Sequence, residues 1–175
     1  MNEKQMQHGI DYDGRNVTGY IATEKFNGCR AYWDGQKLWS RGGLEVKIPS
    51  SWKESLPPGV SLDGEIYDGK DGVYRCATAI RLGRFTPTMS FVVFDCPDAG
   101  GNYLARLNTA RKYVGGPVFV VGDCRVQTYQ HAEKIMDSIK SYGGEGIVLR
   151  HPDLPYSAGR TDKMLKLKYR WEGIA

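Results

Sequence analysis

Short runs of β-branched and aromatic residues, separated by turn residues, constrain the fold of this chain more than any other feature. They lie at residues 20–24, 29–33, 37–40, 60–67, 89–95, 118–121 and 146–149. Such runs predict strands, because branched and aromatic side chains fit a pleated, half-buried surface. The Asp34-Gly35 pair predicts a hairpin with a type I′ turn, in which both central residues need positive φ. We therefore expect a fold built around β-sheet.

Amphipathic segments between these runs predict helices. The clearest spans residues 129–142, where Thr128 can cap the start and Gly143 can end the helix. Its apolar residues recur at three- and four-residue spacing: Ala132, Ile135, Met136 and Ile139. Residues 103–114 and 74–82 are two further candidates. Strands and helices together predict an α+β fold of mostly antiparallel sheets flanked by helices.

Length and composition favour one domain. A chain of 175 residues that is 41% hydrophobic can bury its own core. Residues 1–18 are polar with little periodicity, so we expect an N-terminal arm over the surface and a domain at residues 19–175. The net charge of +4 is modest but leaves room for a basic, phosphate-binding face.

Targeting and metal-binding patterns are absent from the sequence. Residues 1–9 lack an apolar core, and no stretch approaches the roughly 20 apolar residues of a membrane span. We therefore expect a soluble cytoplasmic protein with no membrane contact. The four cysteines form no CxxC pair, and the three histidines are scattered, which argues against zinc and disulfides. No GxxxxGK[ST] string occurs, so a P-loop is not expected.

A lysine stands at the end of the first strand, in residues 24–30 (EKFNGCR). To attack phosphorus, the amine of Lys25 must be neutral, which requires a pKa depressed by desolvation or by nearby cations. Taken alone, this motif favours an ordinary surface lysine.

Carboxylates occur within two other apolar runs. Residues 62–66 (LDGEI) set Asp63 and Glu65 in a strand, where charge is costly unless it meets a metal, a hydroxyl or a cation. Residues 143–150 (GGEGIVLR) place Glu145 between glycines that permit close approach of a ligand. Plain turns at these positions remain an alternative.

An aromatic ring and two further lysines complete the set of motifs. Phe94, at a strand end, can stack on a base or simply fill the core. Lys166 and Lys168 alternate in residues 164–168 and so project from one face. Two like charges side by side require either solvent or an anion such as phosphate.

In order and content, the five motifs together resemble the covalent nucleotidyltransferase superfamily of DNA ligases, RNA ligases and mRNA capping enzymes. Residues 25–30 resemble its KxDGxR motif, and residues 63–65 resemble its DGE motif. Residues 94–95 resemble its adenine-stacking motif, residues 145–146 its EG motif and residues 166–168 its KxK motif. The amino-acid sequence at residues 30–35, 40–43 and 156–160 looks most like that of small bacterial and phage ATP-dependent DNA ligases. The resemblance covers residues 21–169 and implies a nucleotidyltransferase (ATP-grasp-like) domain.

The resemblance implies a three-step reaction. Lys25 takes AMP from ATP, AMP passes to the 5′-phosphate of nicked double-stranded DNA, and the 3′-hydroxyl displaces it, as in repair or replication. Implied catalytic residues are Lys25, Lys166 and Lys168. Implied ATP-binding residues are Thr23, Glu24, Lys25, Arg30, Glu65, Phe94, Glu145, Lys166 and Lys168. Implied Mg²⁺ ligands are Glu65 and Glu145, and implied DNA contacts are Asn27, Arg41 and Arg160. A monomer is expected.

Two departures from the family pattern concern strand joining. Asn27 stands where the family usually has Asp; the amide keeps one acceptor oxygen but loses the charge. The chain also ends seven residues after Lys168, whereas family members usually continue into an oligonucleotide-binding (OB) fold domain. We therefore expect no OB-fold domain, and either a truncated chain or a minimal form that works poorly or with a partner supplying that function.

Other functions remain open from the sequence. An RNA ligase or a GTP-dependent capping guanylyltransferase shares the lysine and acidic motifs. A nick-binding module that has lost catalysis fits Asn27 and the missing second domain. Retention of Lys25, Glu65, Glu145, Lys166 and Lys168 argues against that module, since pure binding does not need all five.

Overall fold

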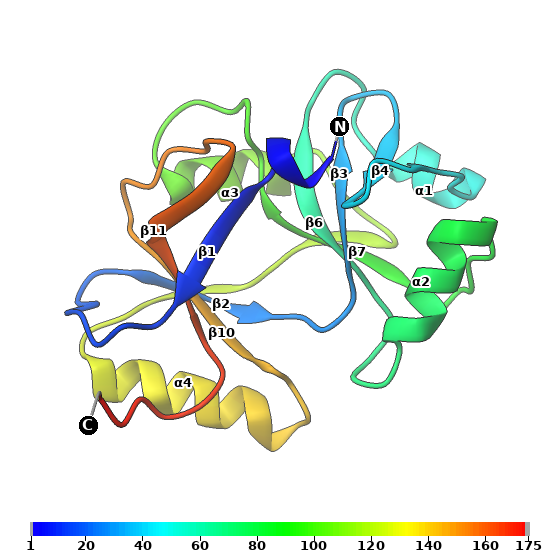
Figure 1. The fold of residues 1–175 in the computed structure, drawn as a ribbon. Helices are drawn as coiled ribbons and strands as arrows, with labels where there is room; N and C mark the ends of the chain where they lie inside the picture. Colours follow the sequence, from blue (N-terminus) through cyan, green and yellow to red (C-terminus); the bar gives the residue numbers. More distant parts are fainter. Residues whose placement is uncertain (1, 174–175) are drawn as a thin grey trace.

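Two β-sheets form the framework of the protein (Figure 1). The computed structural model describes residues 2–173. Sheet A has the order β1-β11-β10-β2-β9. Its strands are β1 (Gln7–Asp11), β2 (Ile21–Lys25), β9 (Asp123–Arg125), β10 (Gly146–Arg150) and β11 (Gly159–Leu167). All pairs in sheet A are antiparallel except β1 with β11.

Sheet B has the order β5-β4-β3-β6-β7-β8 and is antiparallel except for β7 with β8. Its strands are β3 (Cys29–Trp33), β4 (Leu38–Ser40), β5 (Glu45–Val46), β6 (Leu62–Tyr67), β7 (Ser90–Asp95) and β8 (Val118–Val120). The predicted α+β class with mostly antiparallel sheets is confirmed.

Helices flank both sheets. They are α1 (Ser50–Ser55), α2 (Val73–Leu82), α3 (Tyr103–Arg111) and α4 (Tyr129–Ser141), with a short 3₁₀ turn, η1 (Glu3–Gln5). The three predicted helices are confirmed, and α1 was not predicted. The hydroxyl of Thr128 caps α4 by accepting from the His131 N–H at 3.1 Å, and Gly143 follows the helix with a φ of +92°. No helix within residues 2–173 is both long and apolar enough to cross a membrane.

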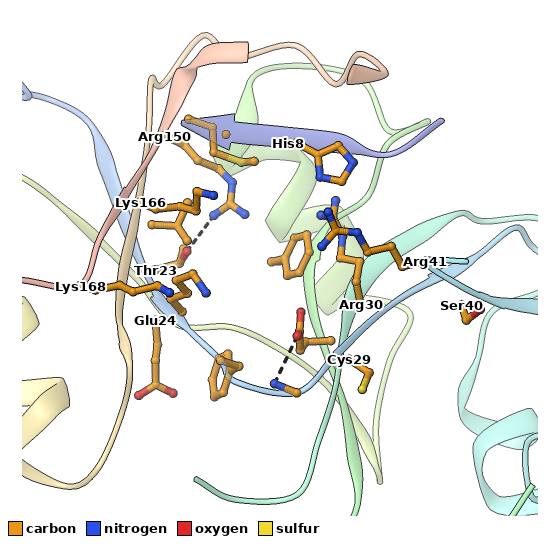
Figure 2. Close-up of a pocket in the computed structure, with 18 of the residues that line it drawn as sticks. His8, Thr23, Glu24, Cys29, Arg30, Ser40, Arg41, Arg150, Lys166 and Lys168 are labelled. Atoms are coloured by element: carbon orange, nitrogen blue, oxygen red, sulfur yellow. Dashed lines mark hydrogen bonds between the residues drawn. The ribbon is translucent and has the colours of Figure 1, made fainter. Parts of the chain in front are cut away.

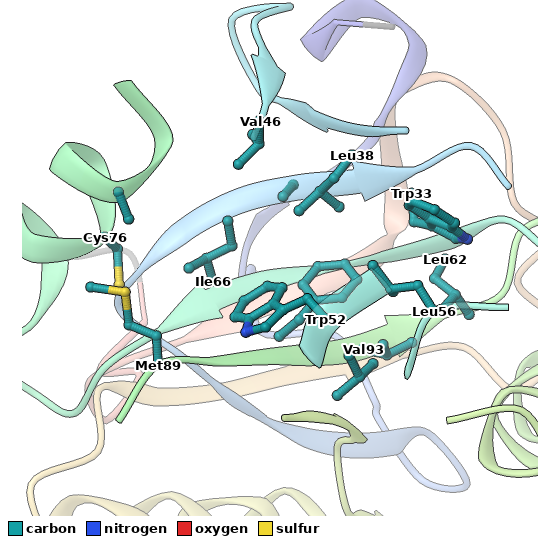
Figure 3. Close-up of a cluster of buried hydrophobic side chains, with 14 of the residues drawn as sticks. Trp33, Leu38, Val46, Trp52, Leu56, Leu62, Ile66, Cys76, Met89 and Val93 are labelled. Carbon is teal, nitrogen blue, oxygen red and sulfur yellow. The ribbon is translucent and has the colours of Figure 1, made fainter. Parts of the chain in front are cut away.

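Three apolar clusters hold these layers together. One lies around sheet B, α1 and α2 and includes Trp52 (Figure 3), whose ring packs against those of Phe85 and Phe91. A second packs α4 against sheet A. A third joins the sheets through α3, where Ile21 of sheet A and Val92 of sheet B meet Tyr103 and Leu107. The third cluster fixes how the two sheets face each other.

The expectation that residues 1–18 form only a surface arm is wrong. β1 is hydrogen-bonded along the edge of sheet A, and Met6 and Val17 are fully buried. The error has a physical cause: β1 pairs with β11, whose residues lie far away in sequence, so local periodicity carries no sign of the pairing. Figure 1 shows β1 and β11 side by side.

The predicted hairpin at Asp34-Gly35 is present, but its turn is not type I′. Gly35 has a φ of +98°, yet no non-glycine residue within 2–173 has a positive φ, which excludes the required conformation at its neighbour. The turn spans residues 34–37 instead and closes with the Asp34 N–H donating to the Lys37 carbonyl at 3.0 Å. The Asp34 carboxylate accepts from the N–H groups of Gln36 and Lys37, which stabilises this longer turn.

Candidate active site

A cavity of about 580 Å³ lies between the two sheets (Figure 2). Strand pairing places Thr23 of β2 and Lys166 of β11 both opposite Val148 of β10. Because side chains alternate along a strand, these positions and their second neighbours face the cavity together. Sheet A therefore supplies one wall, and β3, β6 and β7 of sheet B supply the facing wall.

Lys25, at the end of β2, belongs to a three-residue ion-pair cluster. Its Nζ lies 3.0 Å from Glu145 Oε2, and Lys168 Nζ lies 2.9 Å from Oε1 of the same carboxylate. Partial burial acts to raise the pKa of Glu145, but the two lysine hydrogen bonds outweigh it and lower the pKa. The bond to Glu145 also raises the pKa of Lys168. One ionised carboxylate thus holds two lysines together.

Lys166 adds a further cation to the sheet A wall. It lines the cavity with Lys25 and Lys168, and it forms no ion pair within the described chain. The lining of the cavity carries six Lys or Arg side chains against three carboxylates, those of Asp11, Glu24 and Glu65, which leaves an excess of positive charge. An anion such as phosphate would neutralise it.

Glu65 stands on the opposite wall. Its Oε1 accepts from the Gly28 N–H at 3.3 Å, and burial raises the pKa of Glu65 to about 7. Gly28 is required by space: a Cβ there would lie 2.0 Å from the Ile66 carbonyl oxygen. The glycine of the lysine motif therefore allows the turn after Lys25 to pack directly on β6.

Arg30 is fixed by a buried carboxylate on the neighbouring strand. Its Nε and Nη2 lie 2.7 and 2.6 Å from the two oxygens of Asp63, whose side chain is fully buried. Burial opposes the charged guanidinium, but Asp63 outweighs burial and raises the pKa of Arg30. The Arg30 guanidinium carbon lies 4.8 Å from the centre of the Phe94 ring. Asp63 thus acts through Arg30 rather than lining the cavity.

Most predicted site residues meet at this cavity. Its lining includes Thr23, Glu24, Lys25, Arg30, Arg41, Glu65, Phe94, Lys166 and Lys168. Asn27 and Glu145 line an adjoining cavity of about 250 Å³ that shares Lys25. Arg160 is exposed near the start of β11 and lines neither cavity. Arg41 is exposed and pairs with Glu3 at 2.9 Å.

The side chain of Glu24, implied by the resemblance to bind ATP, forms a hydrogen bond within the protein. Its carboxylate accepts from the Tyr142 hydroxyl at 2.5 Å, and Figure 2 shows it turned away from Thr23. Neighbouring residues of a strand point to opposite faces, which explains why the two side chains point in different directions although both residues line the cavity.

Arg150 and His8 are among the cavity residues that were not identified from the sequence. Arg150 is buried, donates to the Thr23 hydroxyl at 2.7 Å, and lies 5.3 Å from the Phe94 ring centre. Its position at the end of the EGIVLR run could have identified it from the sequence. His8 lies on β1, in the segment interpreted as a surface arm, so no local signal pointed to it.

The cleft between the two sheets thus holds a lysine at a strand end, flanked by cations and carboxylates, which is the arrangement expected from the nucleotidyltransferase motifs. The chain is 28% identical over 163 residues to a DNA ligase of Haemophilus influenzae, covering 90% of this chain and 60% of that protein. It therefore spans less than two thirds of that relative. No family model matches the chain.

Solved structures share the fold. A Lig E DNA ligase superposes with a TM-score of 0.79 at 28% identity, covering 94% of this chain and 68% of that one. A Chlorella virus DNA ligase-adenylate superposes with a TM-score of 0.77 at 20% identity, covering 95% and 67%. The resemblance to the adenylation domain of ATP-dependent DNA ligases, inferred from five short motifs, is confirmed.

Proposed function

We propose that this chain is the adenylation domain of an ATP-dependent DNA ligase and that Lys25 accepts AMP. The observation that carries the proposal is the cluster of Lys25, Lys168 and Glu145 on one cavity wall, facing Glu65 on the other. Sequence and fold similarity to DNA ligases supports the assignment. ATP and nicked double-stranded DNA are the proposed substrates of a cytoplasmic, monomeric enzyme.

The chemistry follows from the groups present. Lys25 Nζ, once it has lost a proton, forms a bond to the α-phosphorus while the bond to the β-phosphate oxygen breaks and pyrophosphate leaves. Lys166 and Lys168 offset the charge that grows on the α-phosphate oxygens. The 5′-phosphate of a nick then displaces Lys25 from AMP, and the 3′-hydroxyl attacks that phosphate and releases AMP.

The residues fit Mg²⁺ only together with a phosphate. No group of three or more His, Cys, Asp or Glu side chains within residues 2–173 could hold a metal ion by itself. Mg²⁺ is commonly bound by one or two carboxylates plus substrate phosphates and water. We propose that Glu65 and Glu145 hold it with the phosphates of ATP; when bound, it withdraws charge from them.

Intact mass spectrometry tests the proposal. The protein is incubated with ATP or GTP and Mg²⁺, beside Lys25→Ala and the matched control Lys53→Ala, which removes an exposed lysine of α1. An AMP-sized adduct on the wild type and the control, but not on Lys25→Ala, is expected. A GMP adduct would instead indicate a capping guanylyltransferase.

A second assay separates ligation from binding. A nick whose 5′ end already carries AMP is offered to the protein, and joining is followed on a gel. DNA and RNA nicks are compared, since preferential joining of RNA would favour an RNA ligase. No adduct and no joining, with nick binding retained, would leave only a binding module and reject the proposal.

A further inference from the structure

Four residues from distant parts of the chain close a ring of hydrogen bonds beside the cavity. The Tyr156 hydroxyl donates to Asp63 Oδ2 at 2.5 Å and accepts from the Gln7 N–H at 3.2 Å. Arg30 Nη2 donates both to Asp63 Oδ2 and, at 2.8 Å, to the Gln7 carbonyl. Every member of the ring thus contacts two others.

Burial makes this ring strong. The side chain of Asp63 is fully buried, and Gln7 is 2% exposed. Hydrogen bonds to a charged group away from water are worth more than those between neutral groups at the surface. The Gln7 side chain adds a second connection, because its Nε2 donates to the Pro155 carbonyl at 2.9 Å.

The ring joins the two walls of the cavity. Gln7 lies on β1 of sheet A, and Tyr156 lies between β10 and β11 of the same sheet. Arg30 and Asp63 lie on β3 and β6 of sheet B. The ring therefore sets the position of one guanidinium relative to both walls.

Arg30 keeps one group free for a ligand. Its Nε and Nη2 are used within the ring, whereas Nη1 forms no hydrogen bond within residues 2–173. The guanidinium also lies against the Phe94 ring, and both residues line the cavity. A rigid fork with one unused nitrogen, Nη1, which carries two N–H donors, gives a directed contact to a ligand oxygen or nitrogen.

We propose that Tyr156 is a positioning residue for ATP binding: through Asp63 and Gln7 it holds Arg30 so that the free Nη1 meets the nucleotide. The inference rests on the proposed function. Asp63 alone could keep Arg30 in place as a charge pair. Tyr156 adds a hydrogen bond to Asp63, and Gln7 adds one to Arg30. Together they prevent the ion pair from rotating and the two walls from moving apart.

Tyr156→Phe tests this with little change in packing, because only the hydroxyl is lost and the ion pair of Arg30 and Asp63 remains. The matched control is Tyr12→Phe, which removes a hydroxyl that donates to the Arg15 carbonyl at 2.7 Å, away from the cavity. AMP adduct formation is measured against ATP concentration for both variants, and the melting temperature is recorded for each.

The expected result is a separation of binding from rate. Tyr156→Phe should need about 10-fold more ATP for half-maximal adduct formation. This factor corresponds to the loss of one hydrogen bond to a charged group. Its maximal rate should stay close to that of the wild type. Tyr12→Phe should keep the wild-type dependence on ATP, although both variants lose melting temperature. Gln7→Met, which removes the connection to Pro155, should shift the ATP requirement in the same direction by less.

A second measurement does not depend on activity. The Nε–H signal of Arg30 in nitrogen-15 NMR spectra, assigned with Arg30→Lys, should exchange faster with water in Tyr156→Phe than in Tyr12→Phe. If the wild type forms no AMP adduct, the proposed function fails, and this signal alone decides the inference. Unchanged exchange would overturn the inference, as would a wild-type ATP requirement in both Tyr156→Phe and Gln7→Met.

Discussion

The two walls of the cavity hold their charges in opposite ways. On the sheet A wall, Lys25 and Lys168 share one carboxylate, and the side chains of all three partners are between about a fifth and two fifths exposed. On the sheet B wall, Arg30 is paired with the fully buried Asp63 inside a closed ring. Charges in contact with water can exchange partners at little cost, whereas a buried pair cannot. The ion pairs of the first wall can therefore rearrange around a ligand, whereas the Arg30–Asp63 pair of the second wall stays in place.

The largest expected effect comes from the sheet A wall. Lys25→Ala should reduce AMP adduct formation to background, because no other group replaces the bond from nitrogen to phosphorus. The same variant should still join a nick that already carries AMP, since that step forms no bond to Lys25. Retention of the adduct in Lys25→Ala, measured by intact mass, would show that another residue is the nucleophile.

The second prediction compares the walls directly. Asp63→Asn leaves the buried Arg30 without a carboxylate and should cost about 3–5 kcal/mol in the free energy of unfolding. Lys168→Met removes one partner of a partly exposed pair and should cost less than about 1 kcal/mol. Adduct formation should nevertheless fall in Lys168→Met. Urea unfolding measures both variants, and equal losses of stability would contradict the contrast between the walls.

The third prediction concerns the link between the walls. Asn27 is exposed in the short connection from β2 to β3 and lines the smaller cavity with Lys25 and Glu145. Asn27→Asp restores the carboxylate typical of the family, and we expect joining of a pre-adenylated nick to rise by roughly 100-fold, at the low end of general-base effects. The rate of adduct formation should change little. A gel assay of single-turnover joining measures the gain, and no gain would exclude a need for charge at this position.

The smallest effect is expected at the end of β6. Burial acts to raise the pKa of Asp68, but hydrogen bonds, that from Arg75 foremost, outweigh it and lower the pKa. A carboxylate whose pKa is depressed in the folded state stabilises the protein above its unfolded value of 3.8, and this contribution is lost as pH falls through the folded value. Arg75→Met should therefore melt slightly below the wild type at pH 6, with the difference closing below pH 3.8. A difference that grows on acidification would contradict this sign.

Much of the fold and site could be predicted because the signals were local. Alternating apolar residues place a strand whatever its partner, and Thr128 and Gly143 mark the ends of α4 by short-range hydrogen bonding and backbone geometry. The five motifs likewise carried their identity in adjacent residues. Arg150, at the end of one such run, lay within reach of the same reasoning and was missed.

Other features depended on partners that local patterns cannot reveal. β1 is polar and became a strand only because the edge of β11 accepts it, and the Asp34-Gly35 turn was decided by side-chain hydrogen bonds rather than by the residue pair. The direction of Glu24 followed from strand alternation and from Tyr142, which stands 118 positions away.

The sequence by itself determined which reactive groups this protein carries: a lysine before a turn, carboxylates in apolar strands and a pair of lysines, in an order that supports the proposed nucleotide transfer to Lys25. Only the tertiary structure decided which of these groups are exposed in the cavity and which are fixed by buried hydrogen bonds. Tyr156 meets Gln7 across 149 positions of the chain and Asp63 across 93. Contacts of that span arise when two sheets pack together, because the energy of burying Asp63 and Arg30 depends on every segment that closes around them.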